Sequence, residues 1–371
     1  MRRVLIMCGV GIGLSVAVFF AYRKENAIWQ YILVPLSLFS TLSGTALQTD
    51  IAQDFYGFQA LVNNIDPYPK LATVYQSIGV AWDLQHTSTH PPTAFLLTAP
   101  VALLPWRWAS AIWAWAMLAA IVVSFRAYGL SWKDALLCTA IALLWPPVTS
   151  SLGQLTPLWL LGVALAFHNR NNKPYLAGMW LGFASLAKFL PGVFLLLFIV
   201  RKKWSAVWGF VMIWALASFV LVTLSPNSIG RYIEVNRIES MSTIARLDNA
   251  AFITSTLVRF CPLLAGIAAA FVMIVTLANY KEWYLEKEIS LRSWTLFSFL
   301  SVVFLPIAWV YSLLPLLPDI FHRVNLPHRS SYLVFAAAMV VIIMPLYSVV
   351  TYYYVAVFFL LYGASFLFDH P

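Results

Sequence analysis

Charged residues are scarce in this sequence, since Asp, Glu, Lys and Arg make up only 10% of its 371 residues. Soluble domains carry roughly a quarter. Hydrophobic residues instead reach 61%, and the mean hydropathy is +0.81. So few charged side chains cannot cover a water-exposed surface. The composition therefore excludes a soluble globular domain and predicts a polytopic membrane protein.

Cysteine is rare as well. Cys8, Cys138 and Cys261 each lie in or beside an apolar run. They form neither a disulfide framework nor the paired spacing of a zinc site, so we expect them to be small core residues. The net charge of +9 comes from basic residues scattered among short loops. This distribution fits contact with membrane lipids and argues against nucleic acid as a partner.

The apolar runs also lack the polar–apolar alternation of barrel strands, which predicts an all-α bundle. We expect about 12–13 transmembrane helices, each needing about 20 residues for a perpendicular crossing. The candidate spans are 4–22, 28–46, 92–105, 108–125, 134–150, 155–168, 175–200, 205–224, 261–280, 294–306, 308–320, 332–348 and 349–368. Several of these spans are shorter than 20 residues. Short helices are tolerated where protein or a water-filled cavity surrounds them.

Two long segments separate these spans within what we expect to be a single integral membrane domain, residues 1–371. Residues 47–91 are predicted to form a first outer loop with interfacial helices, and residues 225–260 a second outer loop. With every candidate span counted as a crossing, lysine and arginine divide equally between the two sides, so the positive-inside rule does not orient the chain. If the arginines of 225–260 bind a ligand, the remaining count places both loops outside.

The first loop, "LQTDIAQDFYGFQALVNNIDPYP" (47–69), concentrates carboxylates at the end of an apolar run. A helix over 50–62 would place Asp50 and Asp54 on one face, with Phe55 and Phe58 as part of an interfacial apolar surface. Asp50 at the helix N-terminus is a candidate general base. The structural alternative is that Asp50 caps the helix and Asp54 is solvated.

Two further patterns in this loop have mainly structural interpretations. Asp66-Pro67-Tyr68-Pro69 predicts a turn. His86 and His90 have helical spacing, but Pro91 follows and no third metal ligand is evident, so His90 is expected to hydrogen-bond. We expect no metal and no other cofactor. A divalent cation shared by Asp50 and Asp54 is the disfavoured alternative.

Cationic candidates for binding an anion are Lys188, Arg237 and Arg246. Lys188 precedes Arg201 by thirteen residues, roughly 20 Å along a continuous helix, and an intramembrane charge favours a functional role. Its structural alternative is pairing with a carbonyl freed by Pro191. Arginine forks match phosphate geometry, although ion pairs to nearby acidic residues explain them equally well.

Polar and aromatic residues near span ends complete the set of candidates: Gln154, Asn249, Trp309 and Tyr311. Each can contact a sugar or an acceptor, and each has a structural explanation as a cap, turn or interfacial aromatic. The span count places Gln154 at the inner edge, opposite Asp50.

Several segments together resemble glycosyltransferase family 87, within the membrane glycosyltransferase C superfamily. They are the Asp50 to Asp66-Pro67-Tyr68 spacing, "HPPTAFLLTAPVALLP" (90–105), "LGQLTPLWLLGVALAFHNRNNKPYLAGMWLGFASLAKFLPGVFLLLFIVRKKW" (152–204), "DNAAFITSTLVRF" (248–260) and "FLPIAWVYSLLPLLP" (304–318). The resemblance covers about residues 28–320, and the shared order of these segments carries it. Relatives often have His two residues after the Trp of the last motif, where this chain has Tyr311.

The resemblance implies a hexosyltransferase that takes mannose from a polyprenyl-phosphate donor and attaches it to a lipid or glycan acceptor. It implies Asp50 as the base, inversion, and an active site on the outer face of a bacterial inner membrane. Asp54 is grouped with Asp50 as a candidate that is either incidental or assisting. Lys188, Arg237 and Arg246 are candidates for the donor phosphate, and His90, Gln154, Asn249, Trp309 and Tyr311 for the sugar or acceptor.

Two other functions are compatible with the sequence. A flippase or transporter of lipid-linked sugars would explain an intramembrane Lys188, but not carboxylates at a junction between loop and helix. A non-catalytic homologue is consistent with Tyr311.

Overall fold

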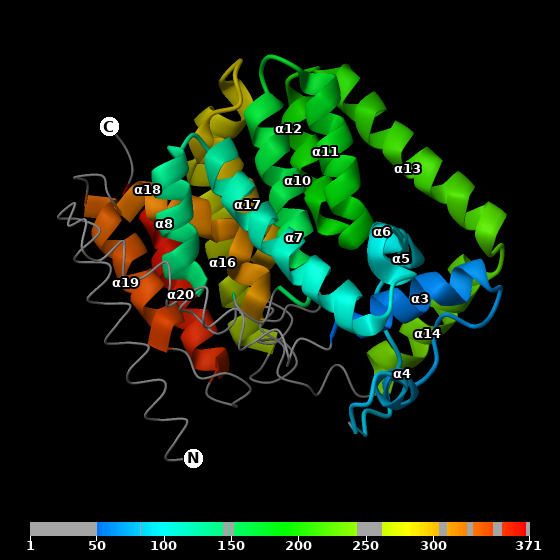
Figure 1. Ribbon diagram of the computed structural model, residues 1–371. Helices are drawn as coiled ribbons and strands as arrows, with labels where there is room; N and C mark the ends of the chain where they lie inside the picture. The colour runs from blue at the N-terminus through cyan, green and yellow to red at the C-terminus, as the bar shows by residue number, and fades with distance from the viewer. Residues whose placement is uncertain are drawn as a thin grey trace. The chain divides into compact units, whose positions relative to one another are not determined.

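The computed structural model describes residues 50–81, 83–143, 148, 152–242, 262–303, 310–324, 329–343 and 351–368. Over these residues the chain forms helices and turns, with one isolated antiparallel bridge between Lys70 and Thr87 (Figure 1). The predicted all-α class is confirmed there. The chain divides into two compact units, residues 44–124 with 150–247 (the site unit) and the remainder (the second unit).

The site unit is built around three packed helices. In it, α11 packs against both α10 and α13, and α3 packs against α4, α5 and α6. Its elements are α3 (Ala52–Val62), α4 (Leu71–Ser77), α5 (Pro92–Leu97), α6 (Ala99–Ala102), most of α7 (Trp106–Ala127), α10 (Thr156–Asn169), α11 (Pro174–Ala187), the 3-10 helix η2 (Leu190–Phe194), α12 (Leu195–Val200), α13 (Trp204–Leu224) and α14 (Ser228–Ser242).

The second unit contains a buried polar cluster. Asp319 accepts hydrogen bonds from Thr295 (2.9 Å) and Tyr362 (2.5 Å), and Arg323 lies 3.6 Å from it. Such mutual pairing makes buried polar groups tolerable. The unit comprises α8 (Trp132–Leu143), α16 (Pro262–Ala278), the π-helix η4 (Lys281–Leu285), α17 (Leu291–Val303), the 3-10 helix η5 (Val310–Leu316), α18 (Leu317–Val324), α19 (Arg329–Ile343) and α20 (Thr351–Ser365).

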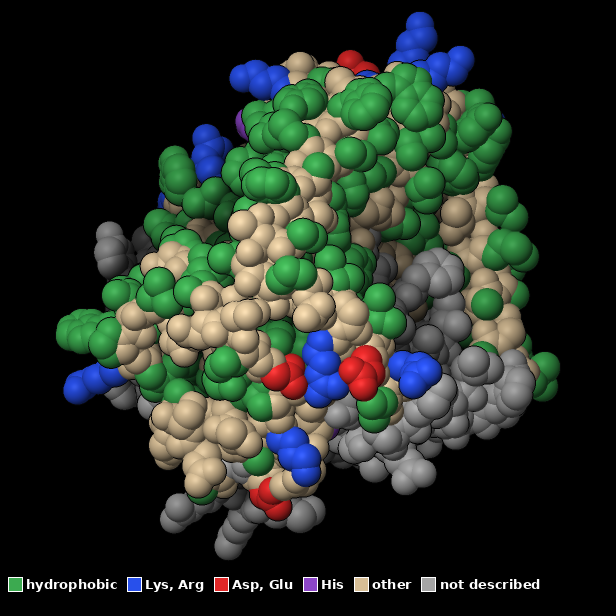
Figure 2. All heavy atoms as spheres, turned by 90° about the vertical axis from the view of Figure 1, so that its right-hand side faces the viewer, with side chains coloured by type: hydrophobic (Ala, Val, Ile, Leu, Met, Phe, Trp, Pro, Cys, Tyr) green, Lys and Arg blue, Asp and Glu red, His purple; other side chains and the backbone are tan. Residues whose placement is uncertain are grey.

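Two described helices, α7 and α13, are long and apolar enough to cross a membrane. Helix α13 exposes large apolar side chains, such as Trp208 (68% exposed) and Phe219 (70%). Hydrophobic side chains cover much of the surface in Figure 2, and charged ones are few. Lipid is the solvent in which such a surface is stable, so the chain is a membrane protein. The total of 12–13 spans stays a prediction.

The candidate span 175–200 is not one helix. Helix α11 ends at Ala187, and Lys188 has extended backbone (φ −152°, ψ 131°) before η2 and α12 continue. Pro191 explains the break, because it has no N–H for the Ala187 carbonyl and its ring would clash with that carbonyl. The candidate span 92–105 is likewise divided, into α5 and α6.

The chain then returns to the side from which α11 started. The Lys203 ammonium donates to Asn171 Oδ1 (3.0 Å) and the Arg170 carbonyl (3.4 Å). Residues 174–203 therefore form a helical hairpin with Lys188 at its turn, and the prediction of a single crossing is wrong. From Lys203, α13 runs to the end of the unit that holds α3, α5 and α14 (Figure 1).

Small residues let α11 and α13 approach closely. A Cβ at Gly178 would lie 1.8 Å from the Ala206 carbonyl oxygen, and one at Gly209 would lie 2.2 Å from the Tyr175 carbonyl oxygen. Backbones can pack this tightly only where side chains are minimal, as in small-xxx-small membrane motifs.

Replacing Gly178 by valine should separate α11 from α13 and destabilise the fold by about 1–3 kcal/mol or more. Thermal unfolding followed by tryptophan fluorescence measures the loss. Gly266→Val on α16 is the matched control, since a Cβ there meets nothing within 4 Å. Equal stability of the two variants would contradict the close approach.

The hairpin predicts that Asn171 and Lys202 lie on one side of the membrane and Gln76 on the other. We expect N171C and K202C, made without the native cysteines, to react with an impermeant maleimide from the same side, and Q76C from the opposite side. Labelling of N171C and K202C from different sides would contradict the hairpin and support a single crossing by residues 175–200.

Candidate functional site

Asp50 lies just before α3, not inside it. The helix begins at Ala52 after Ile51, and the Asp50 carbonyl accepts from the Gln53 N–H at 3.4 Å. Protein buries α3 on most sides, including Phe55 and Phe58. The expected interfacial apolar surface is therefore largely a contact with α4, α5 and α6 instead of with lipid.

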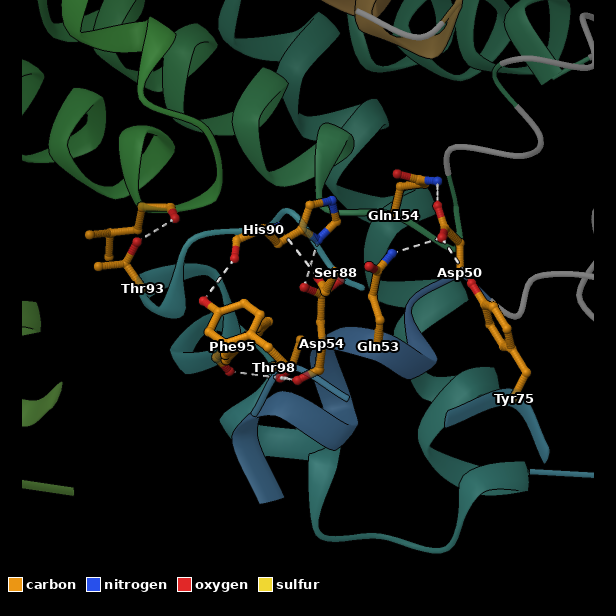
Figure 3. Close-up of polar contacts among 12 residues, drawn as sticks. Asp50, Gln53, Asp54, Tyr75, Ser88, His90, Thr93, Phe95, Thr98 and Gln154 are labelled. Atoms are coloured by element: carbon orange, nitrogen blue, oxygen red, sulfur yellow. Dashed lines mark hydrogen bonds and ion pairs between the residues drawn. The ribbon is translucent and has the colours of Figure 1, made fainter. Parts of the chain in front are cut away.

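Three side chains donate to the Asp50 carboxylate. Gln53 Nε2 donates to Oδ1 at 2.8 Å, the Tyr75 hydroxyl donates to Oδ1 at 3.2 Å, and Gln154 Nε2 donates to Oδ2 (Figure 3). A carboxylate has about four lone-pair positions. These bonds occupy three of them, and no described residue takes the fourth, which lies on Oδ2. Asp50 itself is only partly buried.

The Gln154 contact corrects the predicted position of that residue. A side chain bonded to Asp50 cannot lie at the opposite edge of the membrane. Hydropathy places Gln154 there because 92–105 is apolar enough for a full crossing, whereas α5 and α6 are 6 and 4 residues long.

Burial raises the pKa of Asp50 above its ordinary value of 3.8. The Asp54 carboxylate adds to this increase, whereas His90, the Tyr75 hydrogen bond and Lys188 oppose it. Burial and the Asp50 charge also raise the pKa of Tyr75. Tyr75 therefore stays a neutral phenol that donates, and Asp50 becomes a stronger base than an exposed aspartate.

Asp54 is fully buried, which excludes the solvated alternative. Its Oδ1 lies 2.8 Å from His90 Nδ1, and its backbone carbonyl accepts from Thr98 at 3.2 Å. Figure 3 shows the His90 ring directly over this carboxylate. Asp54 and His90 thus form a pair beside Asp50, and His90 makes the hydrogen bond expected of it.

Lys188 reaches this cluster from the turn of the hairpin. Thr93 of α5 donates to the Leu186 carbonyl at 2.9 Å, which ties the broken end of α11 to the segment that carries His90. The Lys188 ammonium lies 5.5 Å from the centre of the buried Trp159 ring. Its charge also influences Asp50 and His90, so it lies within their electrostatic reach.

Arg231 of α14 holds the turn at Asp66. It forms ion pairs with Asp66 (3.2 Å) and Glu234 (2.8 Å), and the Tyr68 N–H donates to Asp66 Oδ1 at 3.0 Å. The predicted turn is confirmed. Acidic and basic side chains also alternate in a short row on the surface in Figure 2. Arg237, on the same helix, is exposed.

Four other candidates have side chains outside the described part of the chain. Arg246, Asn249 and Trp309 lie outside the described residues, as does the side chain of Tyr311, whose backbone belongs to η5. Sequence reasoning missed Gln53 and Tyr75. The spacing Asp50-x-x-Gln53 resembles a capping box and could have indicated the first, but no local pattern indicates Tyr75.

The described residues contain no group of three or more His, Cys, Asp and Glu arranged to hold a metal ion. Gln53, Tyr75 and Gln154 donate to Asp50, and His90 Nδ1 lies against Asp54 Oδ1. These partners account for the positions of both carboxylates.

A comparison with family models matches glycosyltransferase family 87 over residues 89–312. The matched region includes His90, Gln154 and Lys188 and begins after Asp50 and Asp54. Searches of curated proteins and of solved structures gave no match. The family model covers more than half of the sequence, and the segments that resemble the family lie largely within it. The chain therefore belongs to glycosyltransferase family 87.

Proposed function

We propose that this membrane glycosyltransferase transfers mannose from a polyprenyl-phosphate donor to a hydroxyl of a lipid or glycan acceptor, with Asp50 as general base. The observation that carries the proposal is the Asp50 carboxylate, which Gln53, Tyr75 and Gln154 hold in place while no described residue takes its fourth lone pair. Fixing a base in one orientation is how a site places it against a hydroxyl.

The reaction is a single displacement. Asp50 takes the proton of the acceptor hydroxyl, and the acceptor oxygen forms a bond to the anomeric carbon. The bond from that carbon to the phosphate oxygen breaks, and the lipid phosphate leaves with the electron pair. Attack opposite to the leaving group inverts the anomeric centre. No second carboxylate acts as nucleophile in this scheme, since Asp54 is buried against His90.

The leaving phosphate needs positive charge where its own charge grows. Lys188 supplies such a charge within reach of Asp50, from a position that the hairpin fixes. Arg237 and Arg246 are proposed as further phosphate contacts because arginine pairs with phosphate through two parallel hydrogen bonds.

The distribution of charge in the site unit supports an outer-face active site. The end opposite Asp50 carries Arg170, Lys173 and the run Arg201–Lys203, and no acidic residue lies between 135 and 233. Short basic segments of this kind favour the cytoplasmic side. Asp50, at the other end of α13 and the hairpin, would then face outward.

Asp50→Asn should lower kcat for mannosyl transfer by about 10²–10⁴-fold, because the amide cannot accept the acceptor's proton. The purified variant is assayed in liposomes with a polyprenyl-phosphate mannose donor and candidate acceptors.

Asp83→Asn, which changes an exposed acidic residue of the same loop, is the control and should keep full activity. Undiminished transfer by D50N would refute the base assignment. Movement of lipid-linked sugar across the bilayer without transfer would favour the flippase.

The pH dependence of kcat/KM should show an acid limb from Asp50, with its midpoint above 3.8 because burial raises this pKa. The Tyr75 hydrogen bond lowers the pKa of Asp50, so Tyr75→Phe should move the limb to higher pH. A limb that stays in place in Y75F, or moves down, would show that another group limits the rate.

A further inference from the structure

The buried Asp54 carboxylate requires a positive partner. Its side chain is 1% exposed, and Oδ2 has no hydrogen-bond partner among the described residues. An unpaired ion in such a place costs several kcal/mol. His90, 2.8 Å from Oδ1, supplies this charge at hydrogen-bond distance when it is an imidazolium.

The His90 ring is held in one orientation. Tyr68 donates its hydroxyl to the His90 carbonyl (3.0 Å), and the His90 N–H donates to Ser88 Oγ (3.3 Å). Pro91 follows and further restricts the His90 backbone. With Nδ1 turned to Asp54, Nε2 is the remaining donor, and it points away from Asp54 (Figure 3).

This second nitrogen is available to a ligand. No described residue hydrogen-bonds to Nε2, and the His90 side chain is 20% exposed. A fixed, partly exposed imidazolium N–H beside a base and a lysine is a binding group for an anion.

We propose that His90 Nε2–H binds a phosphate oxygen of the lipid-phosphate donor, and that Asp54 is the positioning residue that keeps His90 protonated and oriented. This role differs from the sugar or acceptor contact expected from the sequence. The identity of the anion rests on the proposed function, whereas the anion-binding group rests on the geometry of His90 and Asp54.

The charges around His90 come from three segments. Asp54 lies on α3, Asp50 lies just before it, and Lys188 follows α11. Burial lowers the pKa of His90, but the charge and hydrogen bond of Asp54, aided by Asp50, outweigh burial and Lys188 and raise it above 6.5.

The balance of charge suits a reaction that releases phosphate. Two carboxylates, Asp50 and Asp54, face two cations, His90 and Lys188, so the cluster is neutral before transfer. When Asp50 takes the acceptor's proton, the cluster gains one positive charge. The phosphate gains one negative charge as its bond to the sugar breaks, so the two changes stabilise each other.

Direct binding tests the proposal without requiring transfer. We expect the wild-type protein in nanodiscs to bind farnesyl phosphate more tightly than farnesol. His90→Gln should weaken farnesyl phosphate binding by about 10-fold or more and leave farnesol binding unchanged. His86→Gln changes an imidazole that lies 3.2 Å from the Thr87 carbonyl and forms no described contact with Asp54, and this variant should bind both ligands as the wild type does.

Asp54→Asn separates positioning from packing. Without the Asp54 charge the pKa of His90 falls, so phosphate binding should persist near about pH 6 and weaken by about pH 8, while the wild type retains it to higher pH. In D54N/H90Q two amides can pair without charge, which keeps the fold. This variant should lose phosphate binding as H90Q does.

Three results would overturn the proposal: no preference for phosphate in the wild type, unchanged phosphate binding in both H90Q and D54N/H90Q, or equal loss of farnesyl phosphate and farnesol binding. Binding of phosphate that depends on His90, without transfer from any polyprenyl-phosphate sugar, would sustain this inference and refute the proposed function.

Discussion

The arrangement of the site unit depends on Pro191. A proline at this position prevents α11 from continuing beyond Ala187. The Thr93 hydroxyl of α5 donates a hydrogen bond to the Leu186 carbonyl, and the chain turns back through η2 and α12. The long helix α13 therefore starts beside Asn171 and carries α14 to the end of the unit where Asp66 lies, so that Arg231 can reach it. A continuous helix would have taken α14 to the other side.

The same break allows charge to be placed deep in an apolar protein. A lysine in mid-helix would meet lipid or neighbouring side chains, whereas Lys188 at a turn is directed to a cluster of opposite charge. The partners of that cluster come from segments far apart in sequence: Asp54 from α3, His90 from before α5 and Gln154 from before α10. Each charge is tolerable because the others are present. The hairpin thus positions Lys188, and the carboxylates of the cluster stabilise its charge.

Composition and local patterns predict the helical class, the turn at Asp66 and the position of Asp50 at the start of a helix, since these depend on neighbouring residues. The path of the chain was less predictable, because hydropathy records how apolar a segment is and not whether it crosses. Residues 92–105 and 175–200 are each apolar enough to predict a crossing, but each is divided into shorter helices. Two wrongly predicted crossings return the chain to the same side, so the predicted side of α14, which follows both segments, is unchanged. Gln154 follows only the first of these segments, and its predicted side is therefore wrong. Tyr75 could not be found because its contact with Asp50 depends on tertiary packing alone.

The Asp50 carboxylate shows how a carboxylate can be fixed in orientation and still have a raised pKa. Each hydrogen bond to a charged group stabilises that charge by about 1.5–3 kcal/mol, so donors from Gln53, Tyr75 and Gln154 would by themselves make a weak base. Burial acts in the opposite direction, because it disfavours the charged form. The net increase in the pKa of Asp50 means that burial prevails. The donors then set the direction in which the remaining lone pair points, while the surrounding protein preserves its affinity for a proton.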